Sequence, residues 1–197
     1  MLRGVAADLG RLDLLVNCAG VTTRAPLESL SWEEWTRVLD IDLHGAFLCL
    51  QAAGRVMLEQ GSGAIVNIAS IAAERGAFGR AAYCVAKAGL VALTRVASTE
   101  WAPRGVRVNA VGPWYVETAF LREAVDKGAI DKGEILARIP ARRMASPDEI
   151  AAVVAFLASP DAAYFSGQTL YPDGGFLVDY GVSSTPRAPS GDQAGSR

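Results

Sequence analysis

Ser70, Tyr83 and Lys87 have the side-chain types and spacing that proton transfer requires. Tyr83 and Lys87 are four residues apart at the start of an expected helix, so both side chains leave the same helix face. A free tyrosine has a pKa of about 10, and a neighbouring ammonium group lowers that pKa by favouring the phenolate. Tyr83 is therefore expected to exchange a proton with a carbonyl or alcohol oxygen that Ser70 holds. Most tyrosine and lysine pairs with this spacing are only surface neighbours, so the surrounding elements decide the assignment.

The elements that must position these residues alternate between strand and helix. Short apolar runs predict buried strands at residues 14–16, 64–69 and 106–111. Helical patterns follow the first two runs, one over residues 32–60 with a bend at Gly45, and one over residues 81–102. This order predicts right-handed crossovers and a parallel sheet of the α/β class. Ser70 then follows the carboxyl end of a strand, where such sheets place their ligands.

Capping signals and loose segments organise the rest of the chain. Ser31 and Glu34 have capping-box spacing, as do Ser146 and Glu149, and the second pair starts a helix that ends near Ser159. Residues 114–144 mix short helical pieces with glycine and proline and are expected to form a mobile lid. Residues 168–171 are expected to form the last strand, and residues 181–197 a disordered tail.

Composition limits the classes of function. The chain has 197 residues, enough for one domain, and a formal net charge of −2, which argues against a nucleic-acid partner. Its three cysteines are odd in number and lie among apolar residues, which is typical of reduced cytoplasmic thiols. His44 is the single histidine, so no zinc site is expected. We expect no membrane span, because no apolar run approaches about 20 residues.

Several of these segments together resemble one known family. Asn17-Cys18-Ala19-Gly20 follows a strand, Ser70 follows the next, and Tyr83-Cys84-Val85-Ala86-Lys87 and Arg107-Val108-Asn109-Ala110 come after them. In this order they are similar to the single-domain short-chain dehydrogenase/reductase family, over residue 1 to about residue 176. The resemblance implies a Rossmann-like doubly wound parallel sheet and hydride transfer between NAD or NADP and a small-molecule alcohol or ketone.

The resemblance also implies roles for individual residues. Tyr83 would be the general acid/base and Ser70 would orient the substrate, while Lys87 would lower the tyrosine pKa and bind the nicotinamide ribose. The residues that match cofactor-contacting positions are Asn17, Ala19, Gly20, Tyr83, Lys87, Pro113, Val116 and Thr118. Relatives assemble through their long helices and last strand, so a homodimer or homotetramer is expected of a full-length protein.

The chain also departs from the family pattern at its start. The family begins with a strand and a glycine-rich turn that binds the cofactor pyrophosphate. Aligned by Asn17-Cys18-Ala19-Gly20, this chain is expected to begin in the helix before the fourth strand. Residues 1–180 would then be the catalytic portion of the domain, and strand 14–16 would lie at a sheet edge. We hypothesise that the true start lies upstream or that the chain is a fragment. The missing segment would also distinguish NAD from NADP.

Three side chains differ from, or add to, the family pattern. Asp42 occupies the place of the fourth catalytic residue, usually an asparagine that helps hold a water leading from the lysine to solvent. A carboxylate is tolerable there if the backbone carbonyl does most of the work, and disturbing if the side-chain amide matters. Trp114 replaces a glycine, and it and Phe78 either contact substrate or only pack.

Two functions remain open at this point. The leading hypothesis is an NAD(P)-dependent oxidoreductase that interconverts a secondary alcohol and a ketone with a Ser-Tyr-Lys proton-transfer centre. The alternative is a non-catalytic fragment that acts by association and does not bind the dinucleotide alone.

Overall fold

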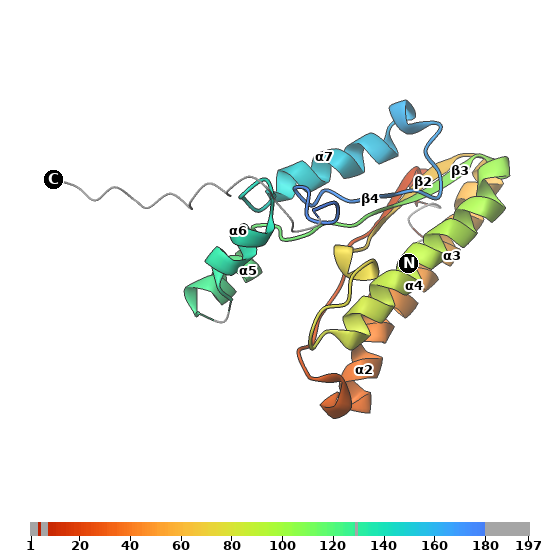
Figure 1. The fold of residues 1–197 in the computed structure, drawn as a ribbon. Coiled ribbons are helices and arrows are strands. Elements are labelled where there is room, and N and C mark those ends of the chain that lie inside the picture. Colours follow the sequence, from red (N-terminus) through yellow and green to blue (C-terminus); the bar gives the residue numbers. More distant parts are fainter. Residues whose placement is uncertain (1–3, 5–7, 129, 180–197) are drawn as a thin grey trace.

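The fold is an α/β sandwich built on a parallel sheet, as a computed structural model that describes residues 4, 8–128 and 130–179 shows (Figure 1). The sheet has the strand order β1-β2-β3-β4, and every pairing is parallel. Its strands are β1 (Leu14–Asn17), β2 (Gly63–Ile68), β3 (Val106–Val111) and β4 (Thr169–Leu170). The predicted fold class and strand positions are confirmed, although β4 is shorter than expected.

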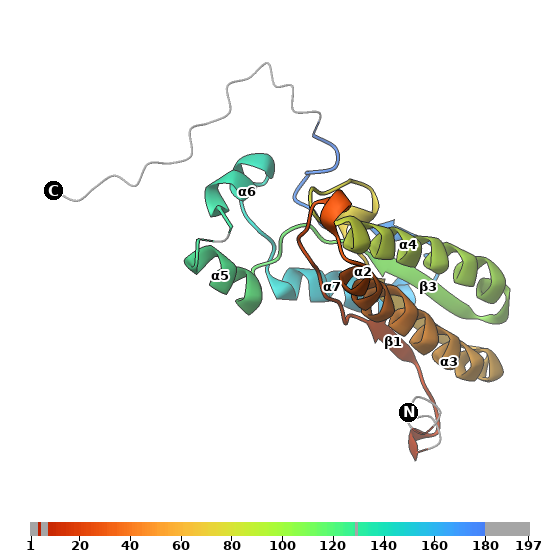
Figure 2. The same cartoon turned by 90° about the horizontal axis from the view of Figure 1, so that it is seen from below.

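Helices cover both faces of the sheet. In Figures 1 and 2, α3 and α4 lie side by side on one face and α7 lies on the other. The helices are α2 (Trp32–Leu39), α3 (Gly45–Gln60), α4 (Ala81–Trp101), α5 (Ala119–Asp126), α6 (Lys132–Arg138) and α7 (Pro147–Ala158). The short turns are η1 (Leu27–Ser29), η2 (Asp40–His44), η3 (Ile71–Ala73), η4 (Ala102–Arg104) and η5 (Pro160–Ala162).

The core divides along the two faces of the sheet. On one face, Leu50 and Met57 of α3 pack against Ile65 and Val108 of the sheet. On the other face, side chains of α7 pack against the opposite sides of β2 and β3. The alternation of side chains along each strand supplies both faces with apolar groups. The sheet is therefore buried on both sides at β2 and β3.

The expected long helix over residues 32–60 is interrupted by a turn of π-helix. α2 continues into η2, a π-helical turn at Asp40–His44, and α3 then begins at Gly45. The interruption thus lies directly before the glycine at which a bend was expected. Such turns occur often at functional sites, and this one contains the buried Asp42.

The two capping signals have different outcomes. At α7 the box is complete, because the Ser146 hydroxyl accepts from the Glu149 backbone N–H at 3.2 Å and the Glu149 carboxylate accepts from the Ser146 N–H at 2.8 Å. At α2 the Ser31 hydroxyl accepts from the Glu34 N–H at 3.1 Å, but the Glu34 side chain pairs with Arg37 instead. The capping box of Ser31 and Glu34 is therefore only half formed.

The helix α4 is more apolar than the sequence analysis anticipated. By length and composition alone, Ala81–Arg104 would suffice to cross a membrane, contrary to the expectation that no apolar segment is long enough. In the structure, however, Leu90, Val91 and Ala97 of this helix are buried in the protein. Its apolar side chains thus contribute to the core of the sandwich.

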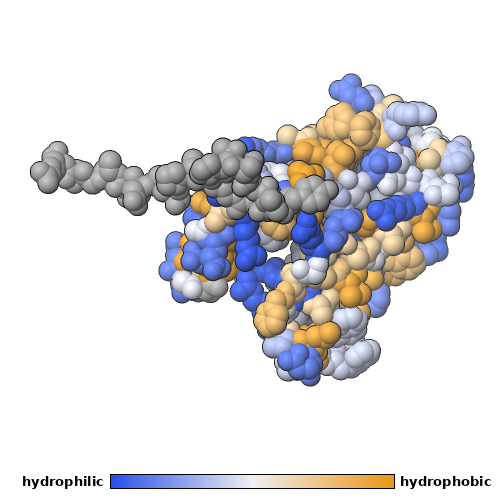
Figure 3. Space-filling model, in the orientation of Figure 1, coloured by the Kyte–Doolittle hydropathy of each residue, from blue (hydrophilic) through white to orange (hydrophobic). Residues whose placement is uncertain are grey.

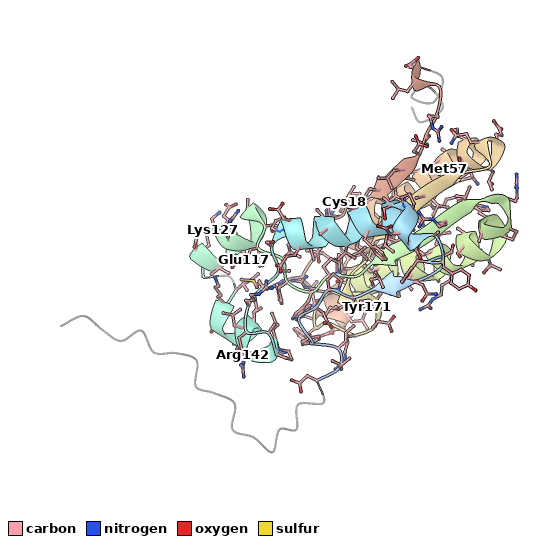
Figure 4. All side chains as sticks on the ribbon, turned by 90° about the horizontal axis from the view of Figure 1, so that it is seen from above. Cys18, Met57, Glu117, Lys127, Arg142 and Tyr171 are labelled. Atoms are coloured by element: carbon pink, nitrogen blue, oxygen red, sulfur yellow. The ribbon has the colours of Figure 1, made fainter. Side chains whose placement is uncertain are left out.

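Two parts of the fold lie at the margin of the sandwich, the edge strand β1 and the helical pair α5 and α6. β1 is an edge strand, and its Leu14 and Val16 are 40% and 38% exposed, as expected of an uncovered face. Residues 114–144 contain α5 and α6, which share a small apolar cluster of their own. Figure 4 shows Lys127 and Arg142 in this part of the molecule, at the end opposite Met57 of α3. The tail expected at residues 181–197 lies outside the described residues.

Candidate active site

Ser70, Tyr83 and Lys87 meet at the carboxyl end of β2. Ser70 lies just beyond β2 and caps η3, because its hydroxyl accepts from the Ala72 N–H at 3.2 Å. Tyr83 lies in the first turn of α4, and its phenol is close enough to the Ser70 hydroxyl for Ser70 to lower its pKa. The Lys87 ammonium nitrogen lies 5.5 Å from the centre of the Tyr83 ring. The structure thus brings together the three residues that were expected to transfer protons.

Lys87 is buried and held by one hydrogen-bond acceptor and one carboxylate. Its side chain donates to the Ile68 carbonyl oxygen at 3.1 Å, and its Nζ lies 3.3 Å from Oδ2 of Asp42. Lys87 is 3% exposed and Asp42 is 1% exposed. The other carboxylate oxygen of Asp42 accepts from the Val21 N–H at 2.7 Å. Asp42 therefore acts through its side chain, as the ion-pair partner of Lys87 and as an anchor for the loop after β1.

The contact between Asp42 and Lys87 is an ion pair rather than a hydrogen bond. The distance between the charged atoms satisfies an ion pair, yet Oδ2 of Asp42 accepts no well-directed hydrogen bond from any described residue. Coulomb attraction has no strict angular requirement, so the short distance is sufficient for an ion pair. The carboxylate is thus charge-compensated but incompletely hydrogen-bonded, which is unusual for a buried group.

Gly20 closes against this buried pair. A Cβ atom at this position would lie 3.0 Å from Oδ2 of Asp42 and 3.3 Å from Nζ of Lys87. Any side chain would therefore displace one of the two charged groups. The glycine is required here by the close approach of the loop to the pair.

The pKa of Tyr83 differs in direction from the sequence-based expectation. Burial raises the pKa of this phenol above its ordinary value, the hydrogen bond from Ser70 lowers it, and the negative charge of Asp42 raises it again. The net direction is upward. The expectation of a lowered tyrosine pKa is therefore wrong in its net direction, because burial dominates and the carboxylate of Asp42 adds to its effect.

The Asn17 amide is used inside the sheet. Its nitrogen donates to the Asn67 side-chain oxygen at 2.8 Å, and the Asn67 nitrogen donates to the Thr94 hydroxyl at 2.9 Å. The Thr94 hydroxyl in turn donates to the Leu90 carbonyl at 2.8 Å. These bonds link β1, β2 and α4, so the Asn17 side chain has a structural role. Ala19 and Gly20, by contrast, are exposed beside Lys87.

The residues after β3 border the site through their backbone. The Pro113 carbonyl accepts from the Ile71 N–H at 3.2 Å, which joins this loop to the turn after Ser70. Val116 forms an isolated bridge with Ala145. The Thr118 hydroxyl caps α5 by accepting from the Leu121 N–H at 3.2 Å. Pro113 therefore lies nearest the proton-transfer residues.

An open cavity of about 650 Å³ adjoins the turn that follows Ser70 and the residue before α4. Its wall includes Ile71, Phe78 and Trp114, so both aromatic residues that were substrate-contact candidates border this space. Trp114 stacks on Phe176 with ring centres 4.5 Å apart, and its ring centre lies 4.4 Å from that of Tyr115. Figure 3 shows the hollow on this face, with strongly hydrophilic residues around it.

Four arginines that the sequence analysis did not single out also line the cavity. They are Arg24, Arg75, Arg80 and Arg138. Their separation in the sequence conceals the cluster, although Arg75 and Arg80 flank the short segment between η3 and α4. Arg75 and Arg80 lie between Ser70 and Tyr83 in the sequence. Their position there could have indicated that arginines lie close to the candidate site.

Tyr171, labelled in Figure 4, fixes the end of β4 beside the site. A Cβ atom at Gly112 would overlap its ring. The Tyr171 hydroxyl donates to the Glu74 carboxylate at 2.6 Å, and burial together with this carboxylate raises the pKa of the phenol. Tyr171 therefore links β4 to the turn after Ser70.

Comparisons with known proteins agree with this geometry. A family model described as enoyl-(acyl carrier protein) reductase matches residues 1–177. D-threitol dehydrogenase of Mycolicibacterium smegmatis is 47% identical over 175 residues, which are 88% of this chain and 66% of that protein. Acetoacetyl-CoA reductase of Allochromatium vinosum is 39% identical over 178 residues, which are 90% of this chain and 71% of that protein.

The fold matches solved structures of the same kind. A gluconate 5-dehydrogenase from Burkholderia cenocepacia, in complex with NADP and tartrate, superposes with a TM-score of 0.86 at 34% identity. The match covers 90% of this chain and 69% of that structure. The chain thus spans about two thirds of the length of these relatives. From the family match, the sequence identities and the shared fold, we conclude that the chain belongs to the short-chain dehydrogenase/reductase family.

Proposed function

We propose that the chain carries the catalytic portion of an NAD(P)-dependent oxidoreductase that interconverts a secondary alcohol and a ketone. The observation that carries the proposal is the meeting of Ser70 and Tyr83 beside the buried Lys87, whose Nζ lies 5.5 Å from the centre of the Tyr83 ring. The names of the relatives, which are dehydrogenases and reductases, support it, as does the NADP bound in a structural neighbour. Bound NAD(P) would accept or supply the hydride.

Each residue of the centre has a separate task in this proposal. In oxidation, the Tyr83 phenolate takes the hydroxyl proton of the alcohol, and in reduction the Tyr83 phenol returns a proton to the ketone oxygen. Ser70 donates a hydrogen bond to the same substrate oxygen and fixes its direction. Lys87 supplies a positive charge beneath the Tyr83 ring, which favours the phenolate at the moment of transfer.

The residues around Lys87 fit a dinucleotide. Ala19 and Gly20 are small and exposed beside the lysine, so a ligand meets backbone rather than bulky side chains there. Lys87, Tyr83, Pro113, Val116 and Thr118 would complete the contact. In this proposal Asn17 contributes through its backbone, because its side-chain amide is bonded to Asn67.

Titration of the purified 197-residue chain with NADH and NADPH tests the proposal. We expect binding at micromolar concentration, which Lys87→Ala weakens and Arg104→Gln leaves unchanged, because Arg104 is exposed at the opposite end of α4. A well-folded chain that binds neither nucleotide would favour the alternative, a non-catalytic fragment that acts by association. The exposed apolar side chains of the edge strand β1 are the observation behind that alternative.

A further inference from the structure

The cavity beside Ser70 has an unbalanced charge. Four guanidinium groups line it, from Arg24, Arg75, Arg80 and Arg138, and its lining contains no aspartate or glutamate. None of the four is in an ion pair within the described part of the chain. The chain as a whole has a net charge of −2, so this concentration of positive charge is local. Like charges gathered around one space repel each other unless an anion enters.

The four arginines are not equivalent, because two of them also border another hollow. Arg24 and Arg138 also border a second hollow, which is lined by Asp131 and Glu134. Part of their charge is therefore balanced by those carboxylates. Arg75 and Arg80 line only the first cavity among the hollows found in the described residues. They are thus the principal candidates for binding an anion.

Arg75 is held in place by the aromatic wall of the cavity, which includes Phe78, Trp114 and Phe176. Its guanidinium carbon lies 5.7 Å from the centre of the Phe176 ring, and its Nη2 donates to the Leu177 carbonyl at 3.4 Å. Phe176 in turn stacks on Trp114. This support restricts the side chain before a ligand arrives, which reduces the entropy lost on binding.

Arg80 joins the cavity to the proton-transfer residues. It precedes α4 at the N-cap position, without a side-chain capping bond, three residues before Tyr83. Its charge acts on Tyr83 directly, since it lowers the pKa of that phenol. Ile71 and Ala72 of the cavity wall directly follow Ser70. A molecule whose anionic end binds Arg75 and Arg80 would therefore lie beside the turn that follows Ser70 and the N-terminus of the helix that carries Tyr83.

We infer that the cavity selects an anionic substrate, with Arg75 and Arg80 binding its carboxylate or phosphate group. This inference rests on the proposed function, because it names the substrate class of the same site. Guanidinium groups match both anions through paired N–H donors, and they keep their charge at all physiological pH values. The aromatic wall covers the carbon chain of the substrate on the other side.

Calorimetric titration of the chain with three matched probes, without any nucleotide, tests the inference. D-glucitol is neutral, D-gluconate carries a carboxylate at one terminal carbon, and D-glucitol 6-phosphate carries a phosphate. We expect at least one anion to bind roughly tenfold or more tightly than glucitol, since a hydrogen bond to a charged group is worth more than about one factor of ten. The preferred anion then distinguishes a carboxylate site from a phosphate site.

Arginine variants assign the preference to the cavity. Arg75→Gln and Arg80→Gln should each remove most of it, and Arg104→Gln should keep it. Equal binding of all three probes, no binding of any, or a preference that survives the Arg75→Gln/Arg80→Gln double variant would overturn the inference. The nucleotide titration tests the proposed function separately. A chain that binds the anions but not NAD(P)H would contradict the proposed function and leave the anion site standing.

Discussion

Asp42 places a carboxylate beside Lys87, at a position where the family usually has an asparagine. Its two oxygens contact the lysine and the Val21 N–H, so the side chain itself is engaged. These contacts give the carboxylate a structural role, and its part in proton transfer stays a prediction. The charge of Asp42 opposes that of Lys87 at the Tyr83 phenol. Proton transfer by Tyr83 is therefore expected to need a higher pH than an asparagine would allow.

Replacing Asp42 with Asn should lower the pKa of Tyr83. The carboxylate disfavours the phenolate, so removing its charge makes deprotonation easier, and the activity limb that depends on the phenolate moves to lower pH. Ultraviolet titration of tyrosinate in the chain measures this shift directly. The same titration in an Asp42→Asn/Tyr83→Phe variant is the control, because the shifted component must vanish. An unchanged titration curve would exclude a distinctive effect of the carboxylate.

Removing Lys87 alone should destabilise the fold more than removing the pair. Lys87→Met leaves Asp42 as a buried charge without compensation, which costs about 3–5 kcal/mol. The double variant Lys87→Met/Asp42→Asn should recover a large part of that loss, since no charge is then left buried. Urea unfolding of both variants measures the difference. Equal destabilisation by the single and the double change would show that the ion pair does not hold this part of the core.

At the scale of elements, the sequence predicted the regular parts of the fold well. The strand at residues 106–111 and the helices starting at Trp32 and Ala81 lie where apolar periodicity and capping residues placed them. The π-helical turn was not predictable in the same way, because the pattern around Asp40 fits an unbroken helix. Its formation depends on tertiary contacts, namely the ion pair with Lys87 and the bond to Val21.

The candidate site was predictable to a similar degree. The spacing of Tyr83 and Lys87 and the position of Ser70 after a strand were sufficient to bring these residues together. The direction of the Tyr83 pKa was not, because burial by the surrounding elements outweighs the neighbouring charge. The arginine cluster also escaped notice, since its members come from three separate segments that only the fold assembles.

Gly54 determines how closely α3 approaches the end of α4. A Cβ atom there would lie 2.7 Å from Cζ3 of Trp101, which is inside contact distance. Gly54→Ala should therefore destabilise the protein by about 1–2 kcal/mol, even though alanine favours a helix interior. Thermal unfolding measures the loss. In a Trp101→Phe background the ring atoms are withdrawn, and the same change should become neutral or stabilising; a loss of equal size in both backgrounds would contradict the overlap.

At the scale of the whole molecule, apolar side chains are exposed on the edge strand β1 and on helices, α4 among them. β1 leaves its Leu14 and Val16 on a face that no described helix covers. On α4, Val85 and Val96 are likewise exposed. Both surfaces are apolar and the net charge is small, so self-association is expected through one of them.

Lysine substitutions identify which surface associates. Val16→Lys places a charge on the edge strand and should lower the association constant measured by sedimentation over a range of concentrations. Val96→Lys places the same charge on α4 and is the matched control. Dissociation by Val96→Lys but not by Val16→Lys would contradict association through the strand edge and would assign it to the helical surface.

The π-helical turn η2 also lets α2 and α3, which follow one another without a break, direct their apolar side chains to different neighbours. An extra residue in a helix rotates all later side chains by about 100° relative to those before it. Val38 of α2 consequently packs with Ala82 and Ala86 near the start of α4, whereas Leu50 of α3 packs on the sheet. Deleting a single residue between Asp40 and His44 would turn the apolar side chains of α2 and of α3 to the same side of the helix. The contact of Val38 with α4 and that of Leu50 with the sheet could then not both form. The π-helical turn that contains the buried Asp42 thus also sets the rotation of α3 relative to α2.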